Sequence, residues 1–106
     1  MLSNNAIMGN SAGDGGGLWI WLSNPTMANN VVAHNHASTA GSGIYLLGSS
    51  PRIVHTTIVG NSGGDGTGIH VRDGIIFPYT STIYLTNTIV VSHSVGIQVA
   101  ADNKAV

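Results

Sequence analysis

The chain of 106 residues has a net charge of −1, no cysteine and only 7% charged residues. This composition fits a single domain, and it excludes disulfides, thiolate metal sites and the basic surface that nucleic acid or an anionic membrane would require. Glu is absent, while Gly, Asn, Ser, Thr, Ile and Val dominate, which favours short strands joined by turns. No apolar stretch reaches membrane-spanning length and no signal peptide is recognisable, so we expect no membrane insertion.

The sequence repeats itself about every 26 residues, a period typical of stacked units of secondary structure. Residues 23–35 align without a gap with residues 49–61. The repeat divides the chain into four coils, which run from about residue 2 to 25, from 26 to 51, from 52 to about 82, and from near 83 onward. A Gly followed by an aliphatic residue recurs once in each coil, at Gly17-Leu18, Gly43-Ile44, Gly68-Ile69 and Gly96-Ile97.

Within each coil the apolar residues alternate, which is the period of a β-strand. Three short strands in each coil, stacked about 4.8 Å apart, predict an all-β, right-handed parallel β-helix over residues 1–106, with an antiparallel all-β fold as the alternative. The chain breaks off within the repeat at both ends, so we interpret it as a segment of a longer β-helix or an uncapped subunit that stacks on other copies. The aligned apolar columns are Leu18, Ile44, Ile69 and Ile97; Ile20, Leu46, Val71 and Val99; Ile7, Val32, Ile58 and Ile89; and Met27, Ile53 and Leu85.

Asn residues and glycines recur at the bends between strands. Because like residues stack in a parallel β-helix, Asn10, Asn35 and Asn61 are expected to pass amide hydrogen bonds from coil to coil as a ladder. A second candidate column of the same kind consists of Asn29, His55 and Asn87. The glycines of the bends are interpreted as residues with positive φ, and they include Gly15, Gly17, Gly41, Gly43, Gly66 and Gly68.

These motifs resemble a known family. The pattern Asn-x-Ala-Ile-x-Gly-Asn-x-Ala, followed by a Gly-rich turn, Gly-Leu and Ser-Asn-Pro, is similar to the right-handed parallel β-helix repeats of the pectate-lyase-like superfamily. Residues 49–61 and 85–90 resemble the polymorphic-outer-membrane-type repeats of long secreted bacterial proteins. The resemblance covers nearly the whole chain and implies an extracellular or cell-surface location. It does not select a function, because this fold occurs in lyases, hydrolases, adhesins and structural stalks.

The acidic residues are too few and too dispersed for the chemistry of that superfamily. Its enzymes use carboxylate-held Ca²⁺ with a basic residue, or clustered Asp residues. Here Asp14, Asp65 and Asp73 each precede a Gly, as turn-forming Asp residues do, and Asp102 lies in the C-terminal tail. We therefore predict no catalytic residue and no cofactor. The alternative is a fragment of a polysaccharide lyase or hydrolase whose other groups lie outside this segment.

The histidines give no metal-binding pattern. His34 and His36 share a face only if the strand continues through Asn35, and no carboxylate or Cys lies at ligand spacing. His55 and His93 occupy Asn positions of the repeat, where a hydrogen-bonding role is the simpler interpretation. We predict no metal site.

The strongest functional signal lies on the outward face of the strands that follow the Gly-aliphatic motif. If Leu18 and Ile20 point inward, then Trp19 and Trp21 point outward. Exposed aromatic residues indicate an interaction surface, whose partner would be another protein segment, another copy, or a polysaccharide stacked on the rings. With the aligned positions of the next two coils, the predicted outward stripe consists of Trp19, Trp21, Tyr45, Leu47, His70 and Arg72.

The third coil is about six residues longer than the second. Insertions of this kind map to surface loops, which often bind a partner, and this one contains Phe77, Pro78 and Tyr79. The alternative is a loop folded back on the wall of the β-helix.

These observations together predict a non-catalytic extracellular structural or adhesive module that presents an interaction surface. The alternatives are a self-stacking filament subunit and a carbohydrate-binding or polysaccharide-degrading fragment. The expected partners are copies stacked end to end or neighbouring coils of a parent protein, and a polysaccharide, but not nucleic acid.

Overall fold

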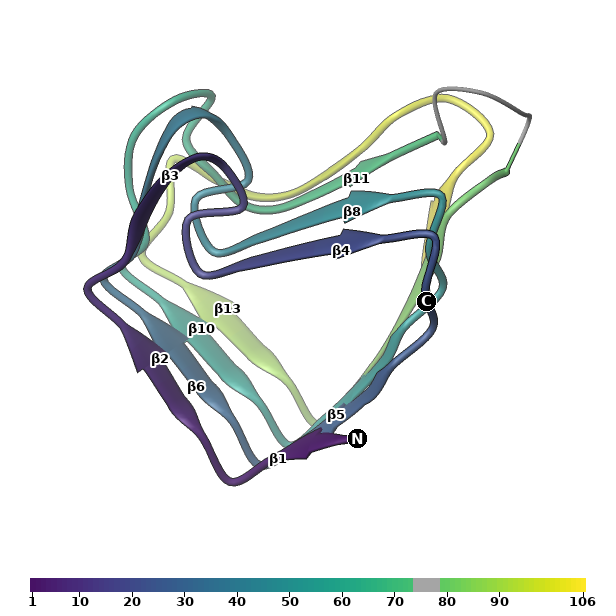
Figure 1. The fold of residues 1–106 in the computed structure, drawn as a ribbon, viewed down its shortest axis with the longest axis horizontal. Helices are drawn as coiled ribbons and strands as arrows, with labels where there is room; N and C mark the ends of the chain where they lie inside the picture. Colours follow the sequence, from purple (N-terminus) through teal and green to yellow (C-terminus); the bar gives the residue numbers. More distant parts are fainter. Residues whose placement is uncertain (74–78) are drawn as a thin grey trace.

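The computed structural model describes residues 1–73 and 79–106, and it shows an all-β parallel solenoid of about four coils. Viewed along its shortest axis, the chain winds around a triangle whose sides are three parallel sheets (Figure 1). The principal extents are 32 × 26 × 18 Å, and the shortest one is the direction in which the coils stack. The predicted fold is confirmed.

Each sheet takes one strand from each of the four coils, and the first sheet has a fifth strand near the C-terminus. The first sheet contains β1 (Leu2–Ser3), β5 (Thr26–Ala28), β9 (Arg52–Val54), β12 (Thr82–Thr86) and β15 (Lys104–Ala105). The second sheet contains β2 (Ala6–Met8), β6 (Val31–Ala33), β10 (Thr57–Val59) and β13 (Ile89–Val91). The third sheet contains β4 (Leu18–Trp21), β8 (Ile44–Leu47), β11 (Thr67–Arg72) and β14 (Val95–Val99). A fourth pair, β3 (Ser11–Asp14) and β7 (His36–Ala40), bulges from the corner between the second and third sheets (Figure 1).

The core is a stack of aliphatic side chains inside the triangle. The register stacks Leu18, Ile44, Ile69 and Ile97, and it also stacks Ile20, Leu46, Val71 and Val99, so both of these predicted columns are confirmed. Met27, Ile53 and Leu85 form the column of the first sheet, as predicted. In the fourth coil the partner of Ile58 is Val90, and Ile89 is exposed, so Ile89 was wrongly assigned to its column.

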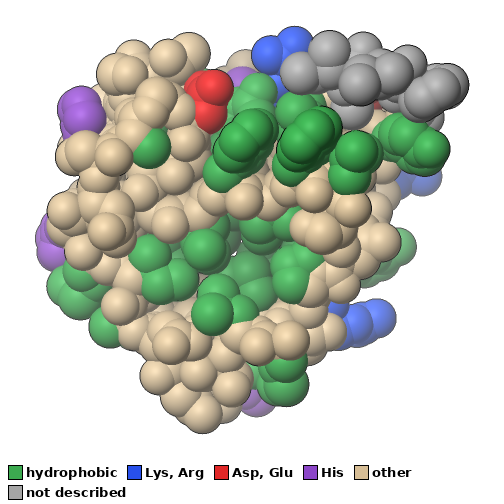
Figure 2. All heavy atoms as spheres, viewed as in Figure 1, with side chains coloured by type: hydrophobic (Ala, Val, Ile, Leu, Met, Phe, Trp, Pro, Cys, Tyr) green, Lys and Arg blue, Asp and Glu red, His purple; other side chains and the backbone are tan. Residues whose placement is uncertain are grey.

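The first and fourth coils leave part of this core open. Leu2, Ile7 and Leu18 of the first coil are only partly buried, as are Leu85, Val90 and Ile97 of the fourth. Figure 2, which faces the first coil, shows hydrophobic side chains gathered in the middle of the triangle. The middle coils are closed because each has a neighbour on both sides, and Ile44, Ile53, Ile58 and Ile69 are fully buried there.

The predicted Asn10–Asn35–Asn61 ladder is present. The backbone N–H and side-chain Nδ2 of Asn10 both donate to Asn35 Oδ1, each at 3.0 Å. The same two groups of Asn35 donate to Asn61 Oδ1 at 2.9 and 3.0 Å. Asn35 and Asn61 are buried, and their amides satisfy polar groups of the neighbouring coils inside the fold, whereas Asn10 at the open end is exposed.

The second predicted column, Asn29, His55 and Asn87, is a row of exposed corner residues rather than a buried ladder. With Asn4, these residues have positive φ, between 46° and 58°, which Asn and His tolerate better than most residues. One side-chain contact links them, between Asn87 Nδ2 and His55 Nε2 at 3.0 Å. The buried ladder lies one residue later, where the N–H and Nδ2 of Asn5 donate to Asn30 Oδ1 at 3.0 and 3.3 Å.

A third ladder runs at the corner between the third and first sheets, where the sequence repeats Ser-x-Pro. The N–H of Ser23 donates to Ser49 Oγ, the N–H of Ser49 donates to Ser81 Oγ, and the N–H of Ser81 donates to Asn103 Oδ1. Ser23 and Ser49 are aligned in the sequence repeat, but the alignment alone does not predict this ladder.

The glycines before the third-sheet strands provide space, not positive φ. Positive φ is found at Gly15, Gly41 and Gly66, as expected, but not at Gly17, Gly43 or Gly68, so the prediction for these three was wrong. A Cβ on Gly17 would lie 2.9 Å from Asn35 Nδ2, and one on Gly43 would lie 3.0 Å from Asn61 Nδ2. The recurring Gly therefore makes room for the Asn ladder.

Candidate functional site: the outward face of the third sheet

The outward face of the third sheet carries the six residues of the predicted stripe in two rows. One row pairs Trp19 with Tyr45 and Tyr45 with His70, and the other pairs Trp21 with Leu47 and Leu47 with Arg72. The rows arise because successive side chains of a strand point to opposite faces, and β4, β8 and β11 stack without a register shift.

Trp19 and Trp21 are the exposed aromatic residues of this face, and Arg72 is exposed as well. Their exposed fractions are 58% and 50%, while Ile20 between them points into the core and is 7% exposed. The two indole rings lie parallel, with an interplanar angle of 3° and a centroid distance of 6.0 Å. Both belong to the first coil, and they form an exposed aromatic surface on the rim of the triangle.

Tyr45 and Leu47 point outward from the core but are not exposed, which corrects the prediction. They are 6% and 3% exposed and form a small separate cluster with Ala40 at the end of β7. The Tyr45 ring stacks on His70 at 5.2 Å and 15°, and its hydroxyl accepts a hydrogen bond from Arg72 Nη1 at 3.5 Å. The middle coil is covered because large side chains of neighbouring coils lie over it.

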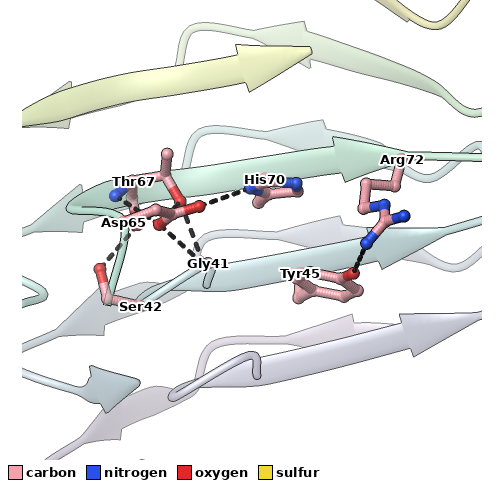
Figure 3. A network of polar contacts seen from close by, with 7 residues as sticks. All are labelled: Gly41, Ser42, Tyr45, Asp65, Thr67, His70 and Arg72. Atoms are coloured by element: carbon pink, nitrogen blue, oxygen red, sulfur yellow. Dashed lines mark hydrogen bonds and ion pairs between the residues drawn. The ribbon is translucent and has the colours of Figure 1, made fainter. Parts of the chain in front are cut away.

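Asp65 organises the polar side of this face, in the turn before β11 (Figure 3). Its Oδ1 accepts hydrogen bonds from the N–H and Oγ1 of Thr67 at 3.0 and 2.6 Å and from the N–H of Gly41 at 3.3 Å. Its Oδ2 contacts His70 Nδ1 at 2.7 Å. Burial alone would raise the pKa of Asp65, but the hydrogen bonds from Thr67, His70 and Gly41 outweigh it and lower that pKa below its ordinary value.

The Asp65 network extends the turn-forming role that the Asp-Gly sequence suggested. The carboxylate joins the second and third coils through Gly41, and it orients His70 above Tyr45. The contact with His70 was not predicted, because Asp65 lies in the turn and His70 on the strand, and only the folded corner brings them together.

A pocket of about 310 Å³ is lined by Leu22, Asn24, Gly48 and Tyr79, of which Leu22 and Asn24 come shortly after the end of β4 in the sequence. Leu22 follows Trp21 directly, is 51% exposed and has a φ of 46°, a conformation that is costly for a branched aliphatic residue. Asn24 Oδ1 accepts a hydrogen bond from the N–H of Ser50 at 2.6 Å. Tyr79 of the predicted insertion loop is exposed at this pocket, whereas Phe77 and Pro78 lie outside the described residues.

The remaining chemistry-bearing residues do not converge. Within residues 1–73 and 79–106, no group of three or more His, Cys, Asp or Glu residues could hold a metal ion. Asp73 accepts a hydrogen bond from Asn103 Nδ2 at 2.7 Å, and Asp14 is exposed at the end of β3. His93 replaces Asn at the end of the Asn10–Asn35–Asn61 ladder, as its position in the repeat suggested.

The comparisons with known proteins identify the fold family. Neither the curated proteins nor the solved structures contain a match to this chain. The part of the chain that the structure describes has no helix long and apolar enough to cross a membrane. The family model described as the right-handed beta helix region matches residues 1–106. The chain therefore belongs to the right-handed β-helix family.

Proposed function

We propose that this chain is a non-catalytic structural module of an extracellular or cell-surface protein, and that it presents an aromatic interaction surface. The observation that carries the proposal is the parallel, exposed pair Trp19 and Trp21 on the rim of the solenoid. The extracellular location rests on the resemblance of the repeats to those of secreted proteins.

The Trp pair is costly to leave in water. Each indole has a large apolar area, and hydrophobic burial is worth about 25 cal/mol per Å² of apolar surface. The fold does not need these two side chains in its core, because the inward column of β4 is filled by Leu18 and Ile20. Exposed aromatic residues of this kind support a role in contacting a partner.

The surroundings of the pair favour an uncharged partner with flat apolar faces. Leu22, Gly48 and Tyr79 line the pocket, and Asn24 adds an amide whose Nδ2 donates no hydrogen bond among the described residues. A sugar ring fits this description, since its C–H face stacks on an aromatic ring and its hydroxyls accept from an amide. A polysaccharide is therefore the finer form of the proposal, and a protein segment is the competing one.

The absence of catalysis in the proposal rests on how the carboxylates are used. Asp65 holds the turn before β11 and Asp73 binds Asn103, so neither carboxylate is free to act on a substrate beside Trp21. A polysaccharide lyase or hydrolase would need at least a second carboxylate or a metal in the same place.

Fluorescence tests the interaction surface directly, because Trp19 and Trp21 are the two tryptophans of the chain. Titration with neutral and acidic oligosaccharides should shift or quench their emission, and Trp19→Ala with Trp21→Ala should abolish binding measured by calorimetry. Tyr84→Ala, an exposed aromatic residue on the first sheet, is the matched control. The proposal fails if the double variant alters neither glycan binding nor association with proteins. Release of reducing ends or unsaturated sugars would instead establish an enzyme.

End-to-end association is a second candidate, favoured by the open face of the first coil (Figure 2). Asn10 Oδ1 accepts no hydrogen bond from the described residues, so another coil of the same repeat could donate to it. In a longer polypeptide the preceding coil would take this place. For a second copy stacked in register, β15 already occupies the edge of β12 on which β1 of that copy would lie, so one of the two strands must be displaced.

Light scattering over a concentration series tests the second candidate. Growth of the particle mass with concentration, and fibres in electron micrographs, would support end-to-end association. A monomer that persists at the highest soluble concentration would reject it, without bearing on the Trp surface.

A further inference from the structure

The Asn10–Asn35–Asn61 ladder ends on a histidine instead of an asparagine. Asn61 directs two N–H donors at His93 Nε2, its backbone N–H at 3.3 Å and its side-chain Nδ2 at 3.2 Å. In the two previous coils the same pair of donors meets the Oδ1 of an Asn. Two donors require an acceptor, so Nε2 carries no proton, and the neutral ring carries its proton on Nδ1.

The other nitrogen of the His93 ring, Nδ1, is buried and has no hydrogen bond among the described residues to offset its burial. The ring packs flat against Gly68, where an added Cβ would lie 2.9 Å from three ring atoms. This burial lowers the pKa of His93 from its ordinary value of 6.5.

We propose that His93 makes the attachment of the fourth coil to the third sensitive to pH. Neutral His93 accepts from Asn61 and holds the corner between β13 and β14. When a proton from solvent binds Nε2, the acceptor becomes a donor that faces two other donors, and the contact with Asn61 is lost. Protonation therefore releases the fourth coil while the Asn10–Asn35–Asn61 part of the ladder keeps its own contacts.

The neighbouring titratable groups do not account for such an effect. The residues in contact with the ring, Asn61 and Gly68, are uncharged, and His93 is the one titratable residue between Thr88 and Ala101. The segments packed around it carry five other titratable groups. Arg72 at the far end of β11 contacts Tyr45. Asp65 and His70 pair with each other, while the exposed His34 and His36 of the second coil lie against Gly60 and Gly63.

The sign of the effect follows from proton linkage. His93 binds its proton more weakly when folded than when unfolded, so the unfolded form takes up the proton first as the pH falls below about 6.5. The stability of the fourth coil is complete above that pH and decreases toward the lowered pKa of the folded form. For a single proton, the ratio of closed to open fourth coil can fall by at most about tenfold per pH unit.

Amide hydrogen exchange between pH 7.5 and 5 measures this ratio for each coil. We expect the protection factors of Asn61, Ile89 and Val95 to fall severalfold over this range, and those of the second coil to stay constant. His93→Asn continues the ladder with a group that does not titrate, so it should remove the pH dependence. His34→Asn is the matched control, because its corner has positive φ, its side chain is exposed, and Asn suits both conditions.

The same pH dependence in His93→Asn would overturn the proposal. A second readout needs no variant: ¹⁵N shifts of the wild-type imidazole at pH 7.5 should show a protonated Nδ1 and an unprotonated Nε2 for His93. The reverse tautomer, or a charged ring at that pH, would also overturn it.

Discussion

Gly43 lies against the amide of Asn61, so closely that a Cβ on Gly43 would be 3.0 Å from Asn61 Nδ2 and 2.6 Å from Gly68 O. The Gly-aliphatic motif and the Asn motif of the repeat are therefore two halves of one arrangement. Because Gly43 has no side chain, the buried amide of Asn61 in the next coil has room to pack against its backbone.

Gly43→Ala is expected to destabilise the fold, because the new methyl group meets backbone and the buried ladder and neither can move freely. The free energy of unfolding should decrease by about 2–3 kcal/mol, as for an overpacked core position. Urea denaturation measures this difference. Gly13→Ala is the control, since a Cβ there has no atom within 4 Å, and a similar loss in both variants would contradict the explanation.

Asn35→Ala tests the ladder itself. It leaves the N–H and Nδ2 of Asn10 without their acceptor and removes the Nδ2 donor to Ile7 O, in a region where Asn35 is fully buried. Asn61 Oδ1 loses the same Nδ2 donor but keeps the backbone N–H of residue 35. We expect the free energy of unfolding to decrease by about 2–4 kcal/mol. Each unsatisfied buried group costs about 1–3 kcal/mol, and the groups of Asn10 regain part of this by binding water.

The contrasting variant is Asn29→Gly, at an exposed corner with a φ of 55°. Since Gly adopts this conformation freely, its effect on stability should stay within about 0.5 kcal/mol. If Asn29 proved as sensitive as Asn35, the assignment of corner and ladder would be reversed.

Asp65 should make the free energy of unfolding depend on pH in a more acidic range than His93 does. Its lowered pKa means that the folded chain holds the carboxylate charged where the unfolded chain already binds a proton. This contribution is present above about pH 3.9 and is lost as the pH falls through the lowered folded-state pKa. Asp65→Asn should lower the denaturation midpoint at pH 7 and reduce the further loss between pH 4 and 2. An unchanged acid profile in Asp65→Asn would show that the Thr67 and His70 contacts do not perturb this carboxyl.

Leu22→Gly is expected to stabilise the chain, although it removes an aliphatic side chain. Leu22 is half exposed and has a φ of 46°, so Gly relieves a backbone cost of about 1–2 kcal/mol against a smaller entropic loss. A net gain of about 0.5–1 kcal/mol should appear as a higher thermal midpoint. Leu22→Ala retains the strain and should not gain, and a loss in both variants would mean that the Leu22 side chain supports the Trp21 surface.

The parts of the fold that were predictable are those where one local rule decides. Alternation along Leu18 to Leu22 and its aligned strands fixes which residues point inward, so two columns of the third sheet followed from the sequence. The run Ile89-Val90-Val91 has no alternation, and its phase is set only by pairing with β10, which places Val90 inside.

The sequence also does not show which of Asn29 and Asn30 is buried at their corner. Two identical side chains are adjacent, and backbone conformation alone sends one to solvent and the other into the ladder. The burial of Tyr45 and Leu47 was not predictable either, because it comes from His70, Arg72 and Ala40, which belong to other strands.

The backbone N–H groups of the three ladders all donate in one direction. Those of Asn10, Asn5 and Ser23 in the first coil donate to the second coil, and those of Asn35, Ser49 and Ser81 donate onward to the next coil. A coil thus presents ladder donors on one side and ladder acceptors on the other, so it can stack on any coil that has the same arrangement. Lengthening by duplication of a whole coil preserves these N–H contacts, because each coil donates to the next one. Such a chain can grow or shrink in units of one coil without redesigning its interior.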